Sequence, residues 1–167
     1  MPVLPAGPTP SKPRLTSPAA LIDESIVTEA PLNPADFEAM VAATDRGATV
    51  GFAGIVRDHD HGQAVADLEY VGHPSAQNFL RAAVAAVAAE YPACAIVAAH
   101  RVGRLAIGDV ALVVAVGAAH RVDAFAGCAA AVDRIKAEVP VWKRQTFVDG
   151  TSEWVACATS APAAYSR

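Results

Sequence analysis

The chain has 167 residues, the usual size of one domain and enough to bury a substantial core. Hydrophobic residues make up 53% and charged residues 18%, and 13 basic and 17 acidic side chains give a formal net charge of −4. This composition excludes a wholly disordered chain. It also argues against a general nucleic-acid binder, which would carry a basic balance. Any anion site must therefore be a local cluster of cations.

The N-terminal segment is rich in proline and predicts a flexible tail. Residues 1–20 contain six prolines, which disfavour helices and strand ladders, and they lack the apolar core of a secretory signal. The alanine-rich stretch at 82–89 is far shorter than the roughly 20 residues that a membrane-spanning helix needs. We expect a disordered tail over 1–20, one catalytic domain over 21–158, a flexible tail over 159–167 and a cytoplasmic location.

In chain order, a short β-type run is expected at 21–29. Asn33 and Pro34 are typical of a helix start, and Gly47 is expected to close that helix. Two strands are predicted next, at 48–57 and 64–71, around a polar turn at 58–63, and a helix follows from Pro74 to Tyr91. Further strands are expected at 95–102 and 110–117, joined by a connection at 101–109, and then a helix at 120–138. The last two strands, at 141–148 and 153–158, flank a hairpin turn at Asp149-Gly150. This order predicts an α+β fold with an antiparallel sheet and flanking helices.

Cationic and imidazole side chains recur at the ends of these predicted elements. They are Arg57, His120, Arg121, Lys136, Lys143 and Arg144. Guanidinium groups and the free N–H groups of a helix start are what a phosphate or carboxylate site requires. For any single residue, solvated surface charge is the commoner explanation. Their shared placement at element ends favours an anion site for the set.

Two further patterns could bind a metal or carry sulfur. The turn at 58–61 reads DHDH, but alternating residues of a tight turn rarely point at one ion, and no third block of ligands follows. Cys94, Cys128 and Cys157 form no CxxC pair. They are interpreted as small buried residues of a reducing compartment, with a sulfur-carrying persulfide as the alternative. We expect no metal and no cofactor.

Four segments carry a resemblance to a known family. In order, they are GFAGIVRDHDHG, AHRVGRLAIGDVALVVAVGAAHRVDAF, VDRIKAEVPVWKRQ and DGTSEWV. Together they cover about residues 22–158 and resemble the large, catalytic subunit of molybdopterin synthase. The resemblance implies an α/β hammerhead-type fold and a sulfurtransferase of molybdenum cofactor biosynthesis.

The resemblance also implies the substrate and the partners. The substrate is cyclic pyranopterin monophosphate. A small ubiquitin-like subunit brings sulfur as a thiocarboxylate on its C-terminal glycine, and two sulfur transfers form the dithiolene of molybdopterin. Large subunits of the family form a homodimer that binds one small subunit at each end, giving a heterotetramer. Neither nucleic acid nor membrane is implied.

The site residues follow from the same resemblance. Lys136 and Lys143 are implied as catalytic, and Arg57 is expected on the substrate's phosphate. The implied substrate-binding set is Ile55, Val56, Arg57, His120, Arg121, Lys136, Lys143, Arg144 and Gln145. The family usually has glutamate at position 145, so a carboxylate role does not carry over to Gln145, whereas a hydrogen-bonding role does.

The sequence leaves the role of the two lysines open. Neighbouring cations favour the neutral amine of a lysine, which could transfer a proton or attack the acyl carbon after sulfur leaves. A charged lysine could instead hold the thiocarboxylate. The alternative function is a module without turnover that docks the partner or binds phosphate.

The helix at 120–138 predicts a site shared between two chains. Fifteen residues separate Arg121 from Lys136, which is roughly 22 Å at about 1.5 Å per residue. Both side chains can serve one pocket of this size only when they come from different copies. We therefore expect a homodimer with two equivalent shared sites.

Overall fold

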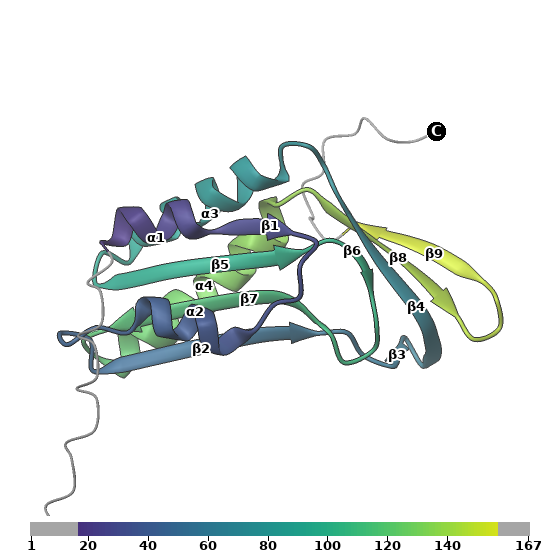
Figure 1. Cartoon of the computed structure of the whole chain (residues 1–167), viewed down its shortest axis with the longest axis horizontal. Helices are drawn as coiled ribbons and strands as arrows, with labels where there is room; N and C mark the ends of the chain where they lie inside the picture. Colours follow the sequence, from purple (N-terminus) through teal and green to yellow (C-terminus); the bar gives the residue numbers. More distant parts are fainter. Residues whose placement is uncertain (1–16, 157–167) are drawn as a thin grey trace, which may run out of the picture.

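The computed structural model describes residues 17–156. Two sheets follow one another along the longest axis of the molecule (Figure 1). The first has the order β1-β5-β7-β2, with β1 at Ile26–Thr28, β5 at Cys94–Arg101, β7 at Val110–Ala118 and β2 at Ala48–Ile55. β1 runs parallel to β5, and the other two pairs are antiparallel.

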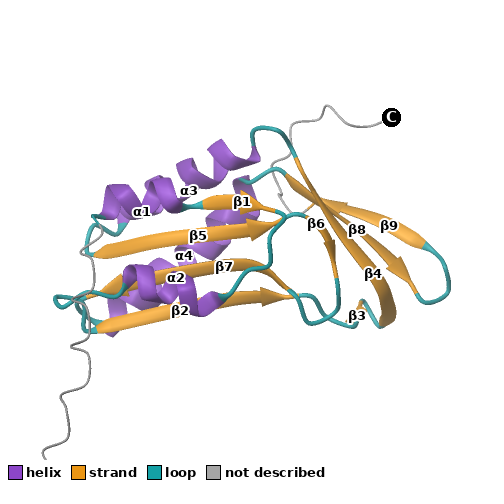
Figure 2. Cartoon of the chain, viewed as in Figure 1, coloured by secondary structure: helices purple, strands orange, loops and turns teal. Residues whose placement is uncertain are grey.

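The helices of the described chain lie against this first sheet (Figure 2). They are α1 at Pro18–Glu24, α2 at Pro34–Val41, α3 at Ala76–Glu90 and α4 at Arg121–Glu138. α3 and α4 pack with Ile96 and Val114 on one face, and α1 and α2 pack with Val97 and Ala115 on the other. Because both faces are covered, β5 and β7 are nearly continuous apolar runs. Within residues 17–156, no helix has the length and apolar character that crossing a membrane requires.

The second sheet is built from hairpins. Its order is β3-β4-β8-β9, with β3 at His59–Asp60, β4 at Gln63–Gly72, β8 at Val141–Phe147 and β9 at Ser152–Ala156, and β6 at Gly103–Leu105 also pairs with β4. The predicted turn between β8 and β9 is confirmed. Gly150 has a φ of 84°, and Asp149 accepts a hydrogen bond from the Thr151 N–H at 2.9 Å.

The predicted fold class is confirmed, and the differences lie at individual elements. The β-type run expected from residue 21 is wrong at its start, because α1 has Pro18 at its first position and the wholly buried Leu21 faces the core. β6 lies inside the predicted connection at 101–109. Residues 1–16 and 157–167, most of the two predicted tails, lie outside the described part of the chain.

The first predicted helix ends earlier than expected. α2 begins at Pro34, with Asn33 as its N-cap, as predicted. It ends at Val41 and not at Gly47, because Ala42 is already extended, with φ −71° and ψ 135°. The Arg46 guanidinium donates to the Val41 carbonyl at 2.9 Å, which satisfies one of the open carbonyls of the last turn.

Gly117 lies where α2 crosses β7. A Cβ atom there would lie 2.3 Å from the Val41 carbonyl oxygen, which belongs to the backbone. We expect Gly117→Ala to lower the free energy of unfolding by about 1–3 kcal/mol, measured by denaturant titration, because a packed core cannot yield this space without a backbone shift. Gly54→Ala is the control, since its nearest contacts are at 3.4 Å. An equal loss in both variants would contradict this explanation.

Candidate active site

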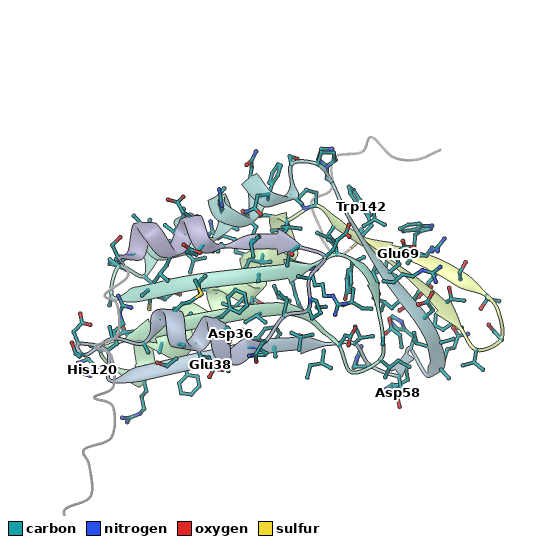
Figure 3. All side chains as sticks on the ribbon, in the orientation of Figure 1. Asp36, Glu38, Asp58, Glu69, His120 and Trp142 are labelled. Carbon is teal, nitrogen blue, oxygen red and sulfur yellow. The ribbon has the colours of Figure 1, made fainter. Side chains whose placement is uncertain are left out.

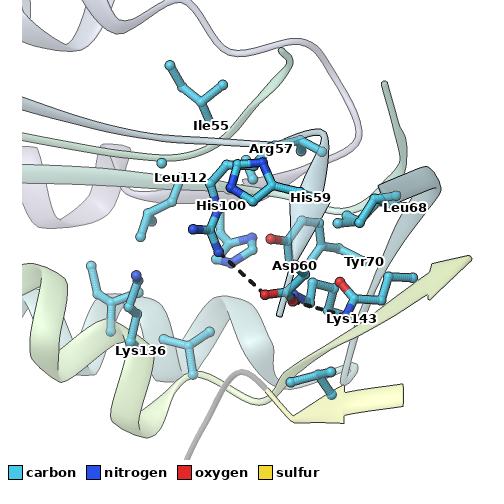
Figure 4. A pocket seen from close by; sticks show the side chains of 18 residues that line it. Ile55, Arg57, His59, Asp60, Leu68, Tyr70, His100, Leu112, Lys136 and Lys143 are labelled. Atoms are coloured by element: carbon cyan, nitrogen blue, oxygen red, sulfur yellow. Dashed lines mark hydrogen bonds and ion pairs between the residues drawn. The ribbon is translucent and has the colours of Figure 1, made fainter. Parts of the chain in front are cut away.

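A cavity of about 500 Å³ lies at the junction of the two sheets (Figure 4). Its wall combines the ends of β2, β5 and α4 with β3, β4 and β8. The lining residues are Gly54, Ile55, Val56, Arg57, His59, Asp60, Val65, Leu68, Tyr70, His100, Ala111, Leu112, Ile135, Lys136, Val139, Lys143, Gln145 and Val155. Six of the predicted site residues are among them: Ile55, Val56, Arg57, Lys136, Lys143 and Gln145.

The two predicted catalytic lysines reach the cavity from different elements. Lys136 is in the last turn of α4, and its Nζ lies 5.9 Å from the centre of the Phe52 ring. Lys143 is on β8, with its side chain only 17% exposed. The turn at Val139 and Pro140 between α4 and β8 is short, so residues seven apart in the sequence face the same space.

The alternation of β8 explains which of its cations faces the cavity. Lys143 and Gln145 line it, and Arg144 between them lies on the opposite face of the sheet, as a strand requires. Arg144 pairs with Glu69 at 3.0 Å and lies 5.7 Å from the Trp154 ring. Arg144 is thus the one cation of β8 that the structure separates from the cavity of its own chain.

The end of β2 supplies the rim of the cavity. The Val56 N–H donates to the Asp109 carbonyl at 2.9 Å, which ties this strand end to the loop before β7. Val56 is buried, and Ile55 is exposed. The Arg57 side chain is 66% exposed and lies 3.5 Å from Asp60. It therefore remains open to an anionic ligand at the rim.

Asp60 joins the cations of the cavity, as Figure 4 shows. Its Oδ2 accepts from Lys143 Nζ at 2.9 Å and from Gln145 Nε2 at 3.0 Å. The hydrogen bonds from Lys143 and then Gln145 lower the pKa of Asp60 from its ordinary 3.8 to about 2. Asp60 is therefore a carboxylate at neutral pH.

This lowered pKa predicts a pH-dependent contribution to stability. A carboxyl group whose pKa is lower in the folded state stabilises that state above its unfolded pKa, here 3.8, and loses the effect as the pH falls toward 2. We expect the difference in unfolding free energy between the parent and Asp60→Asn to be largest above pH 3.8 and to shrink toward pH 2. Denaturant unfolding across this range measures it, and a difference independent of pH would contradict the assignment.

Gln145 is wholly buried beneath this cluster. Its Nε2 donates to Asp60 and also to the Glu153 carboxylate on β9. Its Oε1 is buried and has no hydrogen-bond partner among the described residues. Gln145, where the resemblance led us to expect a glutamate, is thus an amide that joins two carboxylates.

Two aromatic side chains of the cavity were missed by the sequence analysis. His100 is nearly buried, and its Nδ1 donates to the Arg101 carbonyl at 2.9 Å, which leaves Nε2 as the acceptor. Burial lowers its pKa, which favours the neutral ring. Tyr70 packs edge-on against it, with the ring centres 5.3 Å apart. A lone imidazole in the buried apolar run of β5 was the signal that could have identified His100.

His120 and Arg121 lie away from this cavity. They are at the start of α4, whose last turn carries Lys136, and α4 is continuous from Arg121 to Glu138. Figure 3 shows His120 at the opposite end of the molecule from Asp58. One chain therefore does not bring this pair to its own lysines, as the helix length predicted.

A possible group of metal ligands overlaps the cavity. Ligand atoms of Asp60, His61 and Glu153 lie within 4.8 Å of one another. Asp60 already accepts hydrogen bonds from Lys143 and Gln145, and His59 turns toward Asp58 at 2.6 Å. The expectation that the chain binds no metal stays a prediction.

The described cysteines are remote from the cavity chemistry. Cys94 and Cys128 are free and buried, and neither lines the cavity. Burial raises the pKa of both thiols, which disfavours the reactive thiolate. Cys157 lies outside the described residues. The geometry therefore favours the interpretation of Cys94 and Cys128 as core residues over that of a persulfide carrier.

Comparison with known proteins identifies the family. The model described as MoaE protein matches residues 27–138. The molybdopterin synthase catalytic subunit of Nostoc sp. is 36% identical over 148 residues, which cover 87% of this chain and 90% of the relative. Catalytic subunit 1 of Mycobacterium tuberculosis is 34% identical over 77% of this chain and 88% of its own.

Solved structures agree with this assignment. Molybdopterin synthase from Staphylococcus aureus superposes with a TM-score of 0.73 at 31% identity, covering 77% of this chain and 94% of that one. A complex of subunits 1 and 2 of molybdopterin-converting factor from Helicobacter pylori shares the fold, with a TM-score of 0.61 at 17% identity over 78% and 87% of the two chains. The family predicted from the four sequence segments is confirmed: the chain belongs to the MoaE family, whose relatives cited above are catalytic subunits of molybdopterin synthase.

Proposed function

We propose that the cavity is the active site in which this member of the MoaE family makes molybdopterin. Sulfur passes from the thiocarboxylated C-terminus of a small ubiquitin-like partner to cyclic pyranopterin monophosphate. The observation that carries the proposal is that Lys136 and Lys143 line one cavity with Arg57. The comparisons support the reaction, because relatives of this chain are named as catalytic subunits of molybdopterin synthase.

The cavity suits a small anionic substrate. Its volume of about 500 Å³ is within the range of ligand sites, about 300–1,000 Å³. Lys136, Lys143 and Arg57 provide local positive charge in a chain whose net charge is −4. Arg57 at the open rim is placed to hold a phosphate through paired N–H donors.

The surroundings of the two lysines favour different roles. Lys143 forms an ion pair with a carboxylate that fixes its ammonium group at the cavity wall, where it is suited to hold the anionic thiocarboxylate. Lys136 has no ion-pair partner among the described residues and lies near Phe52. The thiocarboxylate sulfur first bonds to a carbon of the pterin, whose oxygen substituent leaves, and this gives a thioester with the partner's glycine. We assign Lys136 as the amine that then attacks the acyl carbon of this thioester, or removes a proton from a water that attacks it, so that the glycine carbon–sulfur bond breaks and sulfur stays on the pterin.

The proposal includes a homodimer with shared active sites. His120 and Arg121 lie roughly 22 Å from Lys136 along α4, at about 1.5 Å per residue. Close to them on α4, Val122 and Phe125 are 70% and 63% exposed and lie three positions apart, on one face of the helix, where a second chain could cover both. A second copy covering this end of α4 would bring His120 and Arg121 to the lysines of its neighbour. With one small subunit at each end, the assembly is a heterotetramer.

The proposed location is the cytoplasm. Cys94 and Cys128 are free thiols, as suits a reducing compartment. Cell fractionation with an antibody against the chain tests this, and recovery of the protein from an oxidising compartment would contradict it.

Reconstitution tests the proposed reaction. The purified chain is mixed with a thiocarboxylated small subunit and cyclic pyranopterin monophosphate, and molybdopterin is measured by mass spectrometry. We expect the product only when all three components are present. The alternative, a module that docks the partner or binds phosphate, predicts binding of either ligand without product.

A further inference from the structure

One acidic side chain lies among the cations of the cavity. Asp60 Oδ2 is 2.9 Å from Lys143 Nζ, and its Oδ1 is 3.5 Å from a guanidinium nitrogen of Arg57. The side chains of Asp60 and Lys143 are only 13% and 17% exposed, so water screens this pair far less than a surface pair. A cavity that accepts anions thus already holds an anion from its own chain.

We propose that Asp60 is the positioning residue of Lys143. It fixes the lysine ammonium at the cavity wall, so that the anionic end of the sulfur donor meets a cation already in place. A lysine side chain has a long flexible stem, and a fixed partner removes the entropy cost of ordering it before the donor binds. This inference rests on the proposed function, in which Lys143 holds the thiocarboxylate.

The backbone around Asp60 makes it a rigid support. β3 and β4 pair as a hairpin in which Asp60 faces Gln63 across a two-residue loop. The loop residues His61 and Gly62 have φ values of 47° and 80°, the left-handed conformation that a tight type I′ turn needs at both positions. This turn holds the Asp60 carboxylate on an element separate from the strand of Lys143.

Gln145 also holds the Asp60 carboxylate in place, through a hydrogen bond from its side-chain amide. It is wholly buried and donates to Asp60 at 3.0 Å and to Glu153. A glutamate at position 145 would place a third carboxylate beside these two, with no donor between them, and mutual repulsion would follow. The amide at position 145 and the carboxylate at position 60 are therefore matched to each other.

The test exchanges the carboxylate at position 60 and the amide at position 145. We compare Asp60→Asn, Gln145→Glu and the double variant with the parent, using Asp58→Asn, an exposed aspartate of the same turn, as the control. The first readout is the single-turnover rate constant in the reconstituted reaction. The second is the nitrogen-15 NMR signal of the Lys143 ammonium group in the full chain, which reports its pairing without any turnover.

We expect Asp60→Asn to lower the rate constant by about 10- to 100-fold, because a catalytic group that is no longer held in place loses about this much. The Lys143 ammonium signal should broaden through faster exchange with water. Gln145→Glu alone should also lower the rate constant. The double variant should recover at least about 10-fold over Asp60→Asn, because it restores one carboxylate to the cluster in which Lys143 and Gln145 share Asp60 as their partner. Asp58→Asn should stay within about twofold of the parent.

Other results would overturn the proposal. The rate constant of Asp60→Asn could stay within about twofold of the parent while Lys143→Ala is inactive. This result would show that Asp60 does not position Lys143, and it would leave the proposed function intact. An unchanged Lys143 ammonium signal in Asp60→Asn, or no recovery of the rate constant in the double variant, would also contradict the positioning role of Asp60. Activity of Lys143→Ala at the parental rate would refute the proposed role of the lysine itself. Should Asp60→Asn not fold, Asp60→Glu moves the carboxylate by one methylene group, and a parental rate in that variant would overturn the proposal.

Discussion

Lys136→Ala is expected to reduce molybdopterin formation in a single turnover by about 100-fold or more. Removal of a proton-transfer group or amine nucleophile costs about this factor. The fold should survive, because the described contact of the Lys136 ammonium group is with the Phe52 ring and not with a buried polar partner. Rapid-quench measurement of the product, with melting temperature as the check on folding, tests this expectation.

Variants of neighbouring cations on α4 and β8 are the controls for the two lysines. Arg134→Ala removes a cation of the same helix that pairs with Glu90 outside the cavity, and it should keep the parental rate. Lys143→Ala should lower the rate of product formation severely. Arg144 lies on the opposite face of β8, so Arg144→Ala should leave the arrangement of Lys143 and Gln145 in the cavity of its own chain unchanged. A near-parental rate for Lys136→Ala in a folded protein would show that the catalytic assignment is wrong.

Mixing two inactive variants is expected to restore part of the activity. Arg121→Ala and Lys136→Ala should each be inactive alone. A mixed dimer contains one site with both residues intact and one with neither, so an equal mixture should regain about one quarter of the parental activity once subunits have exchanged. The expectation follows from α4, which places the two residues at opposite ends of one continuous helix.

The control for complementation is a pair of variants from the same site. Lys136→Ala mixed with Lys143→Ala should regain nothing, because both lysines line the cavity of one chain and every mixed site lacks one of them. Subunit exchange is verified by mass spectrometry of differently labelled chains. Exchange without any return of activity in the Arg121→Ala mixture would refute the shared site.

Much of the fold followed from local sequence patterns. The Asn33-Pro34 start, the apolar runs of β5 and β7 and the Asp149-Gly150 turn each have a direct physical cause in the sequence, and each is present. α1 was missed because a short apolar run does not distinguish a strand from a helix. β6 was missed because a three-residue strand exists only through its pairing with β4.

The candidate site was predictable only in part. The resemblance located Lys136, Lys143 and Arg57, which the cavity brings together. Asp60 and His100 were not predicted, because their importance arises from contacts of β3 with β8 and of β5 with β4, which join residues far apart in the sequence. Arg144 was implied by the same resemblance and lies on the face of β8 opposite the cavity of its own chain, so its substrate-binding role stays a prediction.

Transfer of labelled sulfur shows whether this chain moves sulfur from the small subunit to the pterin. The small subunit is prepared with a thiocarboxylate carrying sulfur-34 and is mixed with this chain and cyclic pyranopterin monophosphate. We expect both sulfur atoms of the molybdopterin dithiolene to carry the label, and we expect Lys136→Ala, although folded, to yield almost no labelled product. Unlabelled product, or binding of both ligands with no dithiolene formed by the parental chain, would contradict it.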